Sequence, residues 1–251
     1  QIENFCLPNC TEYGWNRPEG MDPGMQYNAW LEYQWDTSLE FCFMILLLEE
    51  YTGRDISEYI PLIESCLNFF DEHYRYLARQ RGEPELDSMG MLVLYPGSAC
   101  ETYKAARNAS PTIAALQQVI KALLELPDQY LDDEQRDRWS LMLQTIPPIP
   151  FREIDGHTLI APAESWERIQ NTEIPQLYPV WPWRNYGVGK EGLDTALNTW
   201  KYDPEVESFR DHVSWKQYNI FAACLGLRKE AAEESIKKLQ DSGRRFPAFW
   251  G

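Results

Sequence analysis

The sequence lacks the motifs of several large enzyme classes. It contains only three histidines, and His73, His157 and His212 lie far apart without HExxH or similar spacing. No GxSxG motif is present, and no GxGxxG or GxxxxGKS/T loop follows a strand pattern. Zinc hydrolase, serine esterase and nucleotide-binding functions are therefore disfavoured. We expect neither a metal nor a cofactor.

Long apolar runs and excess basic charge are missing too. The longest apolar run, residues 41–48, is far shorter than the roughly 20 residues that span a bilayer. Lys and Arg number 23 against 39 Asp and Glu, giving a formal net charge of -16. A field of this sign repels phosphate backbones and anionic lipid heads. We therefore expect no nucleic-acid partner and no membrane insertion.

Cysteines are few, and their spacing excludes a simple zinc motif. None of the six belongs to a paired CxxC motif or has a His nearby. Cys42 and Cys66 fall in apolar helix patterns, which predicts small core residues. Only Cys6 and Cys10 are close enough in sequence to suggest a local disulfide. The chain opens on Gln1 without a signal peptide, which indicates a trimmed or internal start.

Hydrophobic periodicity predicts pairs of inner and outer helices. Residues 28–52 are apolar on nearly every side, as in an interior helix, and Gly53 is a suitable C-cap. An amphipathic outer helix begins near Pro61. The same order recurs in residues 111–126 with 132–146, and in 215–225 with 230–239. Period-two alternation occurs only around 151–161, where Asp155 and Gly156 predict a tight hairpin.

The two longest connections, 86–108 and 147–189, are rich in Pro, Gly, Tyr and Trp. Loops of that length in a compact domain are usually functional. The first holds Glu101 among small residues, and a carboxyl near an apolar wall has the raised pKa that a general acid needs. The alternative is that Glu101 is a solvated loop residue or a helix cap.

The second connection carries flat aromatic rings among amide, carboxylate and guanidinium groups. This mixture suits the alternating apolar and hydroxylated faces of sugars. The alternative is that these aromatic rings simply pack beneath a long loop. The candidates for a substrate-binding wall, here and elsewhere in the chain, are Trp30, Gln34, Trp166, Glu173, Trp181, Trp183, Arg184 and Trp215.

Five phrases of the sequence, taken in order, resemble the catalytic domain of family 95 glycoside hydrolases and related six-hairpin glycosidases. Residues 29–53 resemble the inner helix that ends in YxxTGD, and 90–101 the GxLVxxPSxSPEN loop. Residues 146–156 are similar to the LPPxxIGxDGxLxEW strand pair, 177–179 to LYP, and 215–225 to the GWSxxWKxxLWARLxD helix. The sequence departs from the family pattern in two places. Cys100 precedes Glu101 where the SPEN phrase has proline, and Arg168, Gln170 and Glu173 stand in place of the HRHxSH run.

The resemblance implies an all-α fold, an incomplete (α/α)6 toroid of helical hairpins with one short β-hairpin. Residues 1–251 would be the central part of one catalytic domain, truncated at both ends. Glu101 falls on the glutamate of SPEN, which implies a general acid in an inverting glycoside hydrolase whose base lies outside the chain. Relatives of this kind are usually exported by bacteria, which implies a periplasmic or extracellular location.

Two other functions stay open at this point. A polysaccharide lyase on a similar toroid would recruit Tyr178 as base and Arg184 to neutralise a uronate, although the acidic net charge disfavours a polyanion. A non-catalytic toroid would keep the aromatic groove and bind carbohydrate without turnover. The sequence leaves the sugar and the oligomeric state open.

Overall fold

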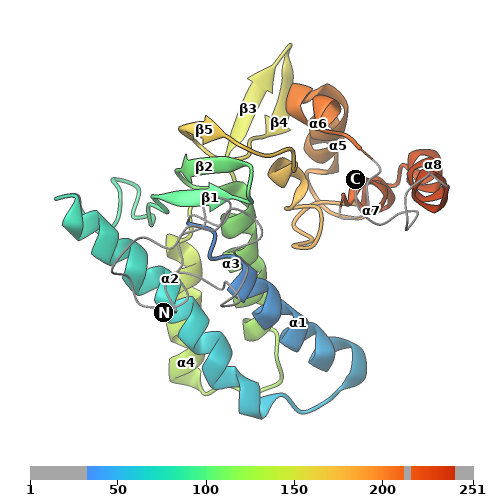
Figure 1. Ribbon diagram of the computed structural model, residues 1–251. Coiled ribbons are helices and arrows are strands. Elements are labelled where there is room, and N and C mark those ends of the chain that lie inside the picture. Colours follow the sequence, from blue (N-terminus) through green and yellow to red (C-terminus); the bar gives the residue numbers. More distant parts are fainter. Residues whose placement is uncertain (1–32, 212–215, 241–251) are drawn as a thin grey trace, which may run out of the picture.

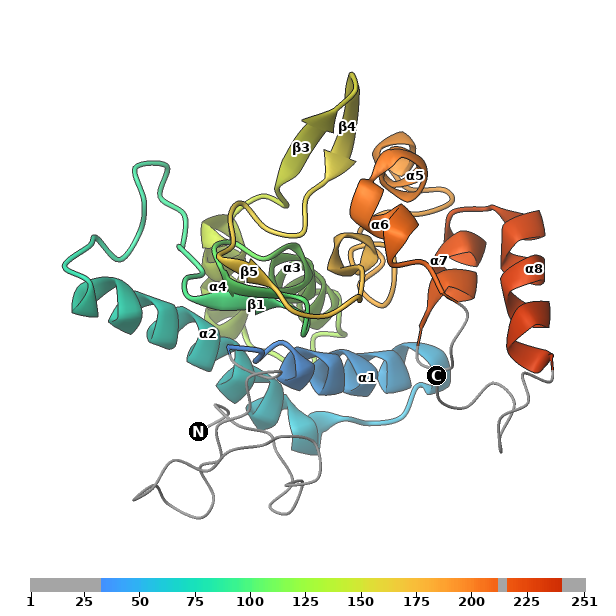
Figure 2. The same ribbon diagram turned by 45° about the horizontal axis from the view of Figure 1, so that its top comes forward.

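The computed structural model describes residues 33–211 and 216–240. The predictions for Cys6, Cys10, Trp30 and Trp215 lie outside the described residues. In Figures 1 and 2, helices α1 to α4 form one group, α5 to α8 form a second group beside it, and two small sheets complete the fold.

The first group contains the helices that periodicity predicted. They are α1 (Thr37–Thr52), α2 (Ile60–Gln80), α3 (Ser110–Leu124) and α4 (Asp133–Thr145). Gly53 ends α1 in the left-handed conformation at φ 64, as a C-cap glycine does. Helix α4 begins with a capping box, in which the Asp132 side chain accepts from the Gln135 N–H at 2.8 Å and the Gln135 side chain accepts from the Asp132 N–H at 2.9 Å.

The second group contains α5 (Leu193–Tyr202), α6 (Pro204–Ser208), α7 (Tyr218–Cys224) and α8 (Arg228–Leu239). Two 3-10 turns, η2 (Ser57–Tyr59) and η3 (Pro175–Leu177), lie between larger elements. Helix α5 packs on strand β4, and α7 packs on α8. The late pair α7 and α8 agrees with prediction, whereas α5 and α6 were not predicted.

Two small antiparallel sheets organise the long connections. One has the order β1 (Gly97–Ala99), β2 (Tyr103–Ala106) and β5 (Arg168–Ile169). The other pairs β3 (Phe151–Ile154) with β4 (His157–Ile160), which confirms the predicted hairpin. Its turn residues Asp155 and Gly156 both have positive φ, 49 and 77, as the tight hairpin turn requires.

The prediction of an all-α toroid is wrong. The described part of the chain is about 51% helical and 10% strand, with eight helices and two small sheets, so it is a mixed α/β structure. Strands β1 and β2 escaped prediction because they are buried along their whole length. A short buried strand shows no alternation of polar and apolar residues, and only that alternation would have identified it.

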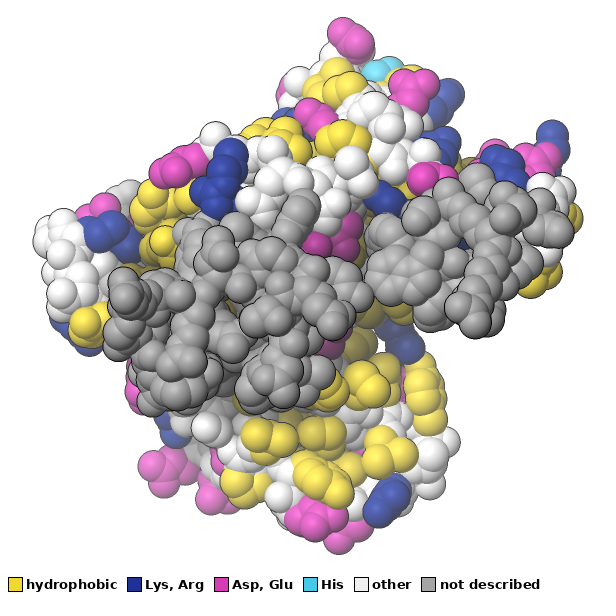
Figure 3. Space-filling view, viewed as in Figure 1, with side chains coloured by type: hydrophobic (Ala, Val, Ile, Leu, Met, Phe, Trp, Pro, Cys, Tyr) yellow, Lys and Arg dark blue, Asp and Glu magenta, His cyan; other side chains and the backbone are white. Residues whose placement is uncertain are grey.

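Helix α3 is the best example of the predicted inner helix, since most of its residues are buried. Helix α1 buries one side through residues that include Phe43, whereas Phe41, Met44 and Tyr51 are exposed. Figure 3 shows apolar side chains gathered over this part of the molecule. Cys42 and Cys66 are buried core residues, as predicted. Within the described ranges, no helix is both long enough and apolar enough to cross a membrane.

Candidate active site

Glu101 lies at the tip of the hairpin between β1 and β2. Ala99 pairs with Tyr103, so the turn consists of only three residues. Cys100 has φ 52, a left-handed conformation that costs a non-glycine residue of order 1–3 kcal/mol and is frequent at functional sites. The turn therefore holds the half-buried Glu101 side chain at a defined position.

Glu173 comes from the second long connection and meets this turn. The Glu101 backbone N–H donates to Glu173 Oε2 at 3.1 Å, across 72 residues of sequence. Thr102 Oγ1 donates to the Glu173 carbonyl at 3.1 Å and accepts from the Glu173 N–H at 3.0 Å. Asn171 Nδ2 donates to Glu101 Oε2 at 2.9 Å. The structure thus brings the Glu173 carboxyl to the turn that holds Glu101, two residues that the sequence nominated separately.

Burial raises the pKa of both carboxyls. For Glu101, the Lys104 charge and the Asn171 hydrogen bond oppose this effect in part. For Glu173, burial is followed by the charge of Glu101 as the cause of the raised pKa. Proximity of two like charges favours a state in which one carboxyl keeps its proton. Such a pair can supply an acid and a base in the same site.

Two further carboxyls extend this group into α1. Burial and then the charge of Glu173 raise the pKa of Glu40. Burial and then the charge of Glu40 raise the pKa of Asp36 to about 7. We call Asp36, Glu40, Glu101 and Glu173 the carboxyl cluster. Among the described residues, no three His, Cys, Asp or Glu side chains are placed to share a metal ion.

Two lysines partly balance the carboxyl cluster. Lys104 is fully buried, and its Nζ donates to Ser98 Oγ at 2.6 Å and to the Cys100 carbonyl at 3.0 Å. Burial lowers the pKa of Lys104 to about 8, against the opposing influence of the nearby acidic groups. Lys216 is also buried and donates to Thr172 Oγ1 at 2.8 Å. Lys104 therefore stabilises, through these two hydrogen bonds, the turn that contains Glu101.

A pocket of about 330 Å³ lies beside the carboxyl cluster. Glu40 belongs to both the pocket and the carboxyl cluster. It lines the pocket, and the charge of Glu173 helps to raise its pKa. The predicted wall residues Trp181, Trp183 and Arg184 all line this pocket. Among the described residues, the lining is Glu40, Phe43, Met44, Leu47, Tyr178, Trp181, Pro182, Trp183, Arg184 and Gln217.

Two other predicted wall residues, Trp166 and Gln34, do not line this pocket. Trp166 packs edge-on against Tyr103 of β2, with ring centroids 5.0 Å apart, and does not line the pocket. Gln34 is half-buried and is also outside the pocket lining. Trp183 lines the pocket but is fully buried and packs against Phe43 at 5.7 Å. Its role is therefore partly that of a core residue.

Sequence reasoning named Asp36 as a possible base beside Glu173 but missed Glu40, Lys104 and Lys216 as site residues. Glu40 did carry a signal, because it is a lone carboxylate at the start of an apolar helix segment. Lys104 carried none, since lysines are almost never fully buried and no local pattern marked this one.

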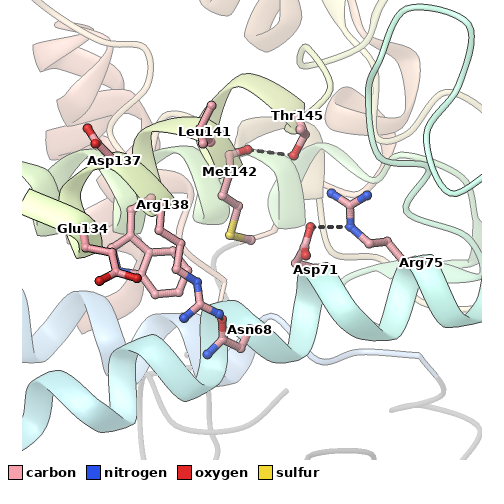
Figure 4. Close-up of a pocket in the computed structure, with 10 residues that line it drawn as sticks. Asn68, Asp71, Arg75, Glu134, Asp137, Arg138, Leu141, Met142 and Thr145 are labelled. Atoms are coloured by element: carbon pink, nitrogen blue, oxygen red, sulfur yellow. Dashed lines mark hydrogen bonds and ion pairs between the residues drawn. The ribbon is translucent and has the colours of Figure 1, made fainter.

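A second, larger pocket of about 490 Å³ lies between α2 and α4 and is shown in Figure 4. Its basic groups already have partners: Arg75 Nε donates to Asp71 Oδ1 at 2.9 Å, and Arg138 donates to Asn68. It contains none of the predicted site residues. We therefore place the candidate active site at the smaller pocket, beside the carboxyl cluster.

Neither a protein-family model nor a curated protein matches this chain.

Proposed function

We propose that this protein hydrolyses glycosidic bonds, with Glu101 as the general acid. The observation that carries the proposal is the contact between Glu101 and Glu173 beside a pocket with aromatic walls. Glycoside hydrolysis generally needs two carboxyl groups, one on each side of the scissile bond. The resemblance of the Glu101 loop to a glycosidase loop points to the same reaction.

In the proposed reaction, Glu101 donates its proton to the leaving oxygen as the bond from that oxygen to the anomeric carbon breaks. Water attacks the anomeric carbon and gives its proton to a second carboxylate. Glu173 is the first candidate for this base, in place of a group outside the chain. Carboxyls roughly 6.5–9.5 Å apart give inversion and carboxyls about 5–5.5 Å apart give retention. We expect inversion, which NMR of the first-formed anomer tests.

The experiment compares wild type with Glu101→Gln on disaccharides and alkyl glycosides. Removing an essential acid should lower kcat by about three orders of magnitude or more, while the circular dichroism melting curve stays close to wild type. Glu125→Gln is the matched control, because Glu125 is an exposed carboxyl at the end of α3. Glu101→Gln activity above a tenth of wild type would overturn the assignment.

The lyase alternative has one observation in its favour, since Tyr178 and Arg184 line the same pocket. Burial, however, raises the pKa of Tyr178 well above its usual range, which opposes its use as a base. A lyase creates an unsaturated sugar that absorbs in the ultraviolet, whereas a hydrolase does not. The absorbance of the product therefore separates the two reactions.

A further inference from the structure

The pocket has a cationic residue that the proposed hydrolysis leaves unused. The Arg184 guanidinium lies 5.7 Å from the ring centroids of both Phe43 and Tyr51 and donates to the Tyr51 hydroxyl. Within the described ranges, no carboxylate forms an ion pair with Arg184. Six other arginines do have such partners: Arg75, Arg79, Arg81, Arg107, Arg136 and Arg152.

A second donor lies next to Arg184 in the pocket wall. Trp183 is fully buried, and its Nε1–H has no hydrogen-bond partner among the described residues. A buried donor without an acceptor is unfavourable, because it has lost its hydrogen bonds to water. An acceptor atom on a bound ligand would remove that cost. Trp183 thus carries an unsatisfied indole N–H next to the Arg184 guanidinium, and both groups prefer an oxygen ligand.

The backbone holds these two donors in place. Arg184 has φ 59, a left-handed conformation that is unfavourable for a non-glycine residue and is frequent at ligand sites. The N–H groups of Asn185 and Tyr186 both donate to the Pro179 carbonyl, at 2.7 and 3.1 Å. These bonds close the loop around Trp183 and Arg184. The loop therefore fixes the backbone position from which the Arg184 side chain extends.

The same pocket includes Glu40 and Tyr178, which interact electrostatically with Glu173. Glu173 in turn contacts Glu101. A ligand in this pocket would meet the carboxyl cluster through Glu40, and it would meet at Arg184 a guanidinium that has no carboxylate partner among the described residues. The volume of about 330 Å³ lies at the small end of the range for small-molecule sites.

We propose that this pocket binds an acidic sugar, with the carboxylate of a terminal uronic acid at Arg184 and its glycosidic bond toward Glu101. This inference rests on the proposed function for the direction in which the sugar lies. A planar carboxylate matches the parallel N–H groups of a guanidinium, and the Trp183 N–H supplies one more donor. The net charge of -16 disfavours a long polyanion, so a single uronate at a chain end fits better than an internal run.

The test is isothermal titration calorimetry on the Glu101→Gln variant, so that no ligand is consumed. The probes are methyl glucuronide, galacturonide and mannuronide, each compared with the neutral methyl glycoside that differs only at C6. We expect at least one uronide to bind about tenfold more tightly than its neutral counterpart, the scale of one charge-assisted hydrogen bond. Adding Arg184→Gln should abolish that preference, and Trp183→Phe should reduce it while keeping an aromatic ring.

Arg138→Gln is the matched control, because Arg138 lies in the other pocket. It should leave the preference for the uronide unchanged. Equal binding of uronide and neutral sugar, failure of every uronide to bind, or a preference that survives Arg184→Gln would overturn the inference. Uronide binding without turnover by wild type would contradict hydrolysis alone. Turnover of neutral glycosides without any preference for uronides would contradict the uronate site alone.

Discussion

The two pocket tryptophans should respond very differently to truncation. Trp183 is fully buried and packs against Phe43, so Trp183→Ala falls among the core substitutions that cost about 3–5 kcal/mol. Losing the unpaired Nε1–H offsets part of that cost, since such a donor is unfavourable by about 1–3 kcal/mol. We therefore expect a net loss of about 2 kcal/mol, which lowers Tm by roughly 4–8 °C in a domain of this size.

Trp181 is only partly buried, and its nearest aromatic partner, Phe221, lies 6.4 Å away between ring centroids. Trp181→Ala should therefore weaken sugar binding with less than half of the Tm shift of Trp183→Ala. The assay is thermal unfolding followed by far-ultraviolet circular dichroism, beside calorimetric sugar titration. A Tm shift below about 3 °C for Trp183→Ala, or equal shifts for both variants, would refute this reasoning.

Three other predictions follow from single contacts. Burial raises the pKa of Asp36 from 3.8 to about 7, so its contribution to stability is full below about pH 4 and is lost as the pH rises through 7. Asp36→Asn should remove this pH-dependent loss of unfolding free energy, measured by urea denaturation between pH 4 and 7. The same dependence on pH in Asp36→Asn and wild type would contradict the prediction. Asp203 is fully buried and accepts from Arg152 at 2.5 Å and from the Val206 N–H at 3.1 Å, while Arg152 also pairs with Glu205. Asp203→Ala should therefore cost about 1–3 kcal/mol in unfolding free energy, and an unchanged stability would count against these contacts. The Asn171 hydrogen bond lowers the pKa of Glu101, so Asn171→Ala should shift the alkaline limb of the kcat/KM profile to higher pH, whereas a fixed limb would exclude Glu101 as the titrating acid.

The long helices could be predicted from the sequence because their patterns are local. Helix α2 shows clear three-and-four spacing, and α4 carries its own capping box. Gly53 also allowed the end of α1 to be predicted, and Asp155 and Gly156 allowed the β3–β4 hairpin to be predicted. The prediction of a helix over 28–52 is wrong at its start, because α1 begins at Thr37 and residues 33–36 are not helical, while residues 28–32 lie outside the described residues.

The three-stranded sheet depends instead on contacts between distant segments. Tyr103 pairs with Ile169 and Lys104 with Arg168, and this register brings Glu101 near Glu173. No local pattern contains that register, because β5 is only two residues long. Sequence reasoning could therefore nominate Glu101 and Glu173 but could not predict their contact. The toroid prediction failed for the same reason, since it treated both long connections as loops between helices.

The central claim is that Glu101 protonates the leaving oxygen, and the dependence on leaving group tests it most directly. A substrate pair is chosen that shares one sugar and carries either a 2,4-dinitrophenyl or a methyl aglycone. A dinitrophenolate departs without protonation, whereas an alkoxide needs the acid. Glu101→Gln should therefore lose about three orders of magnitude on the methyl glycoside and less than about tenfold on the dinitrophenyl glycoside. An equal loss on both substrates would show that Glu101 is not the general acid.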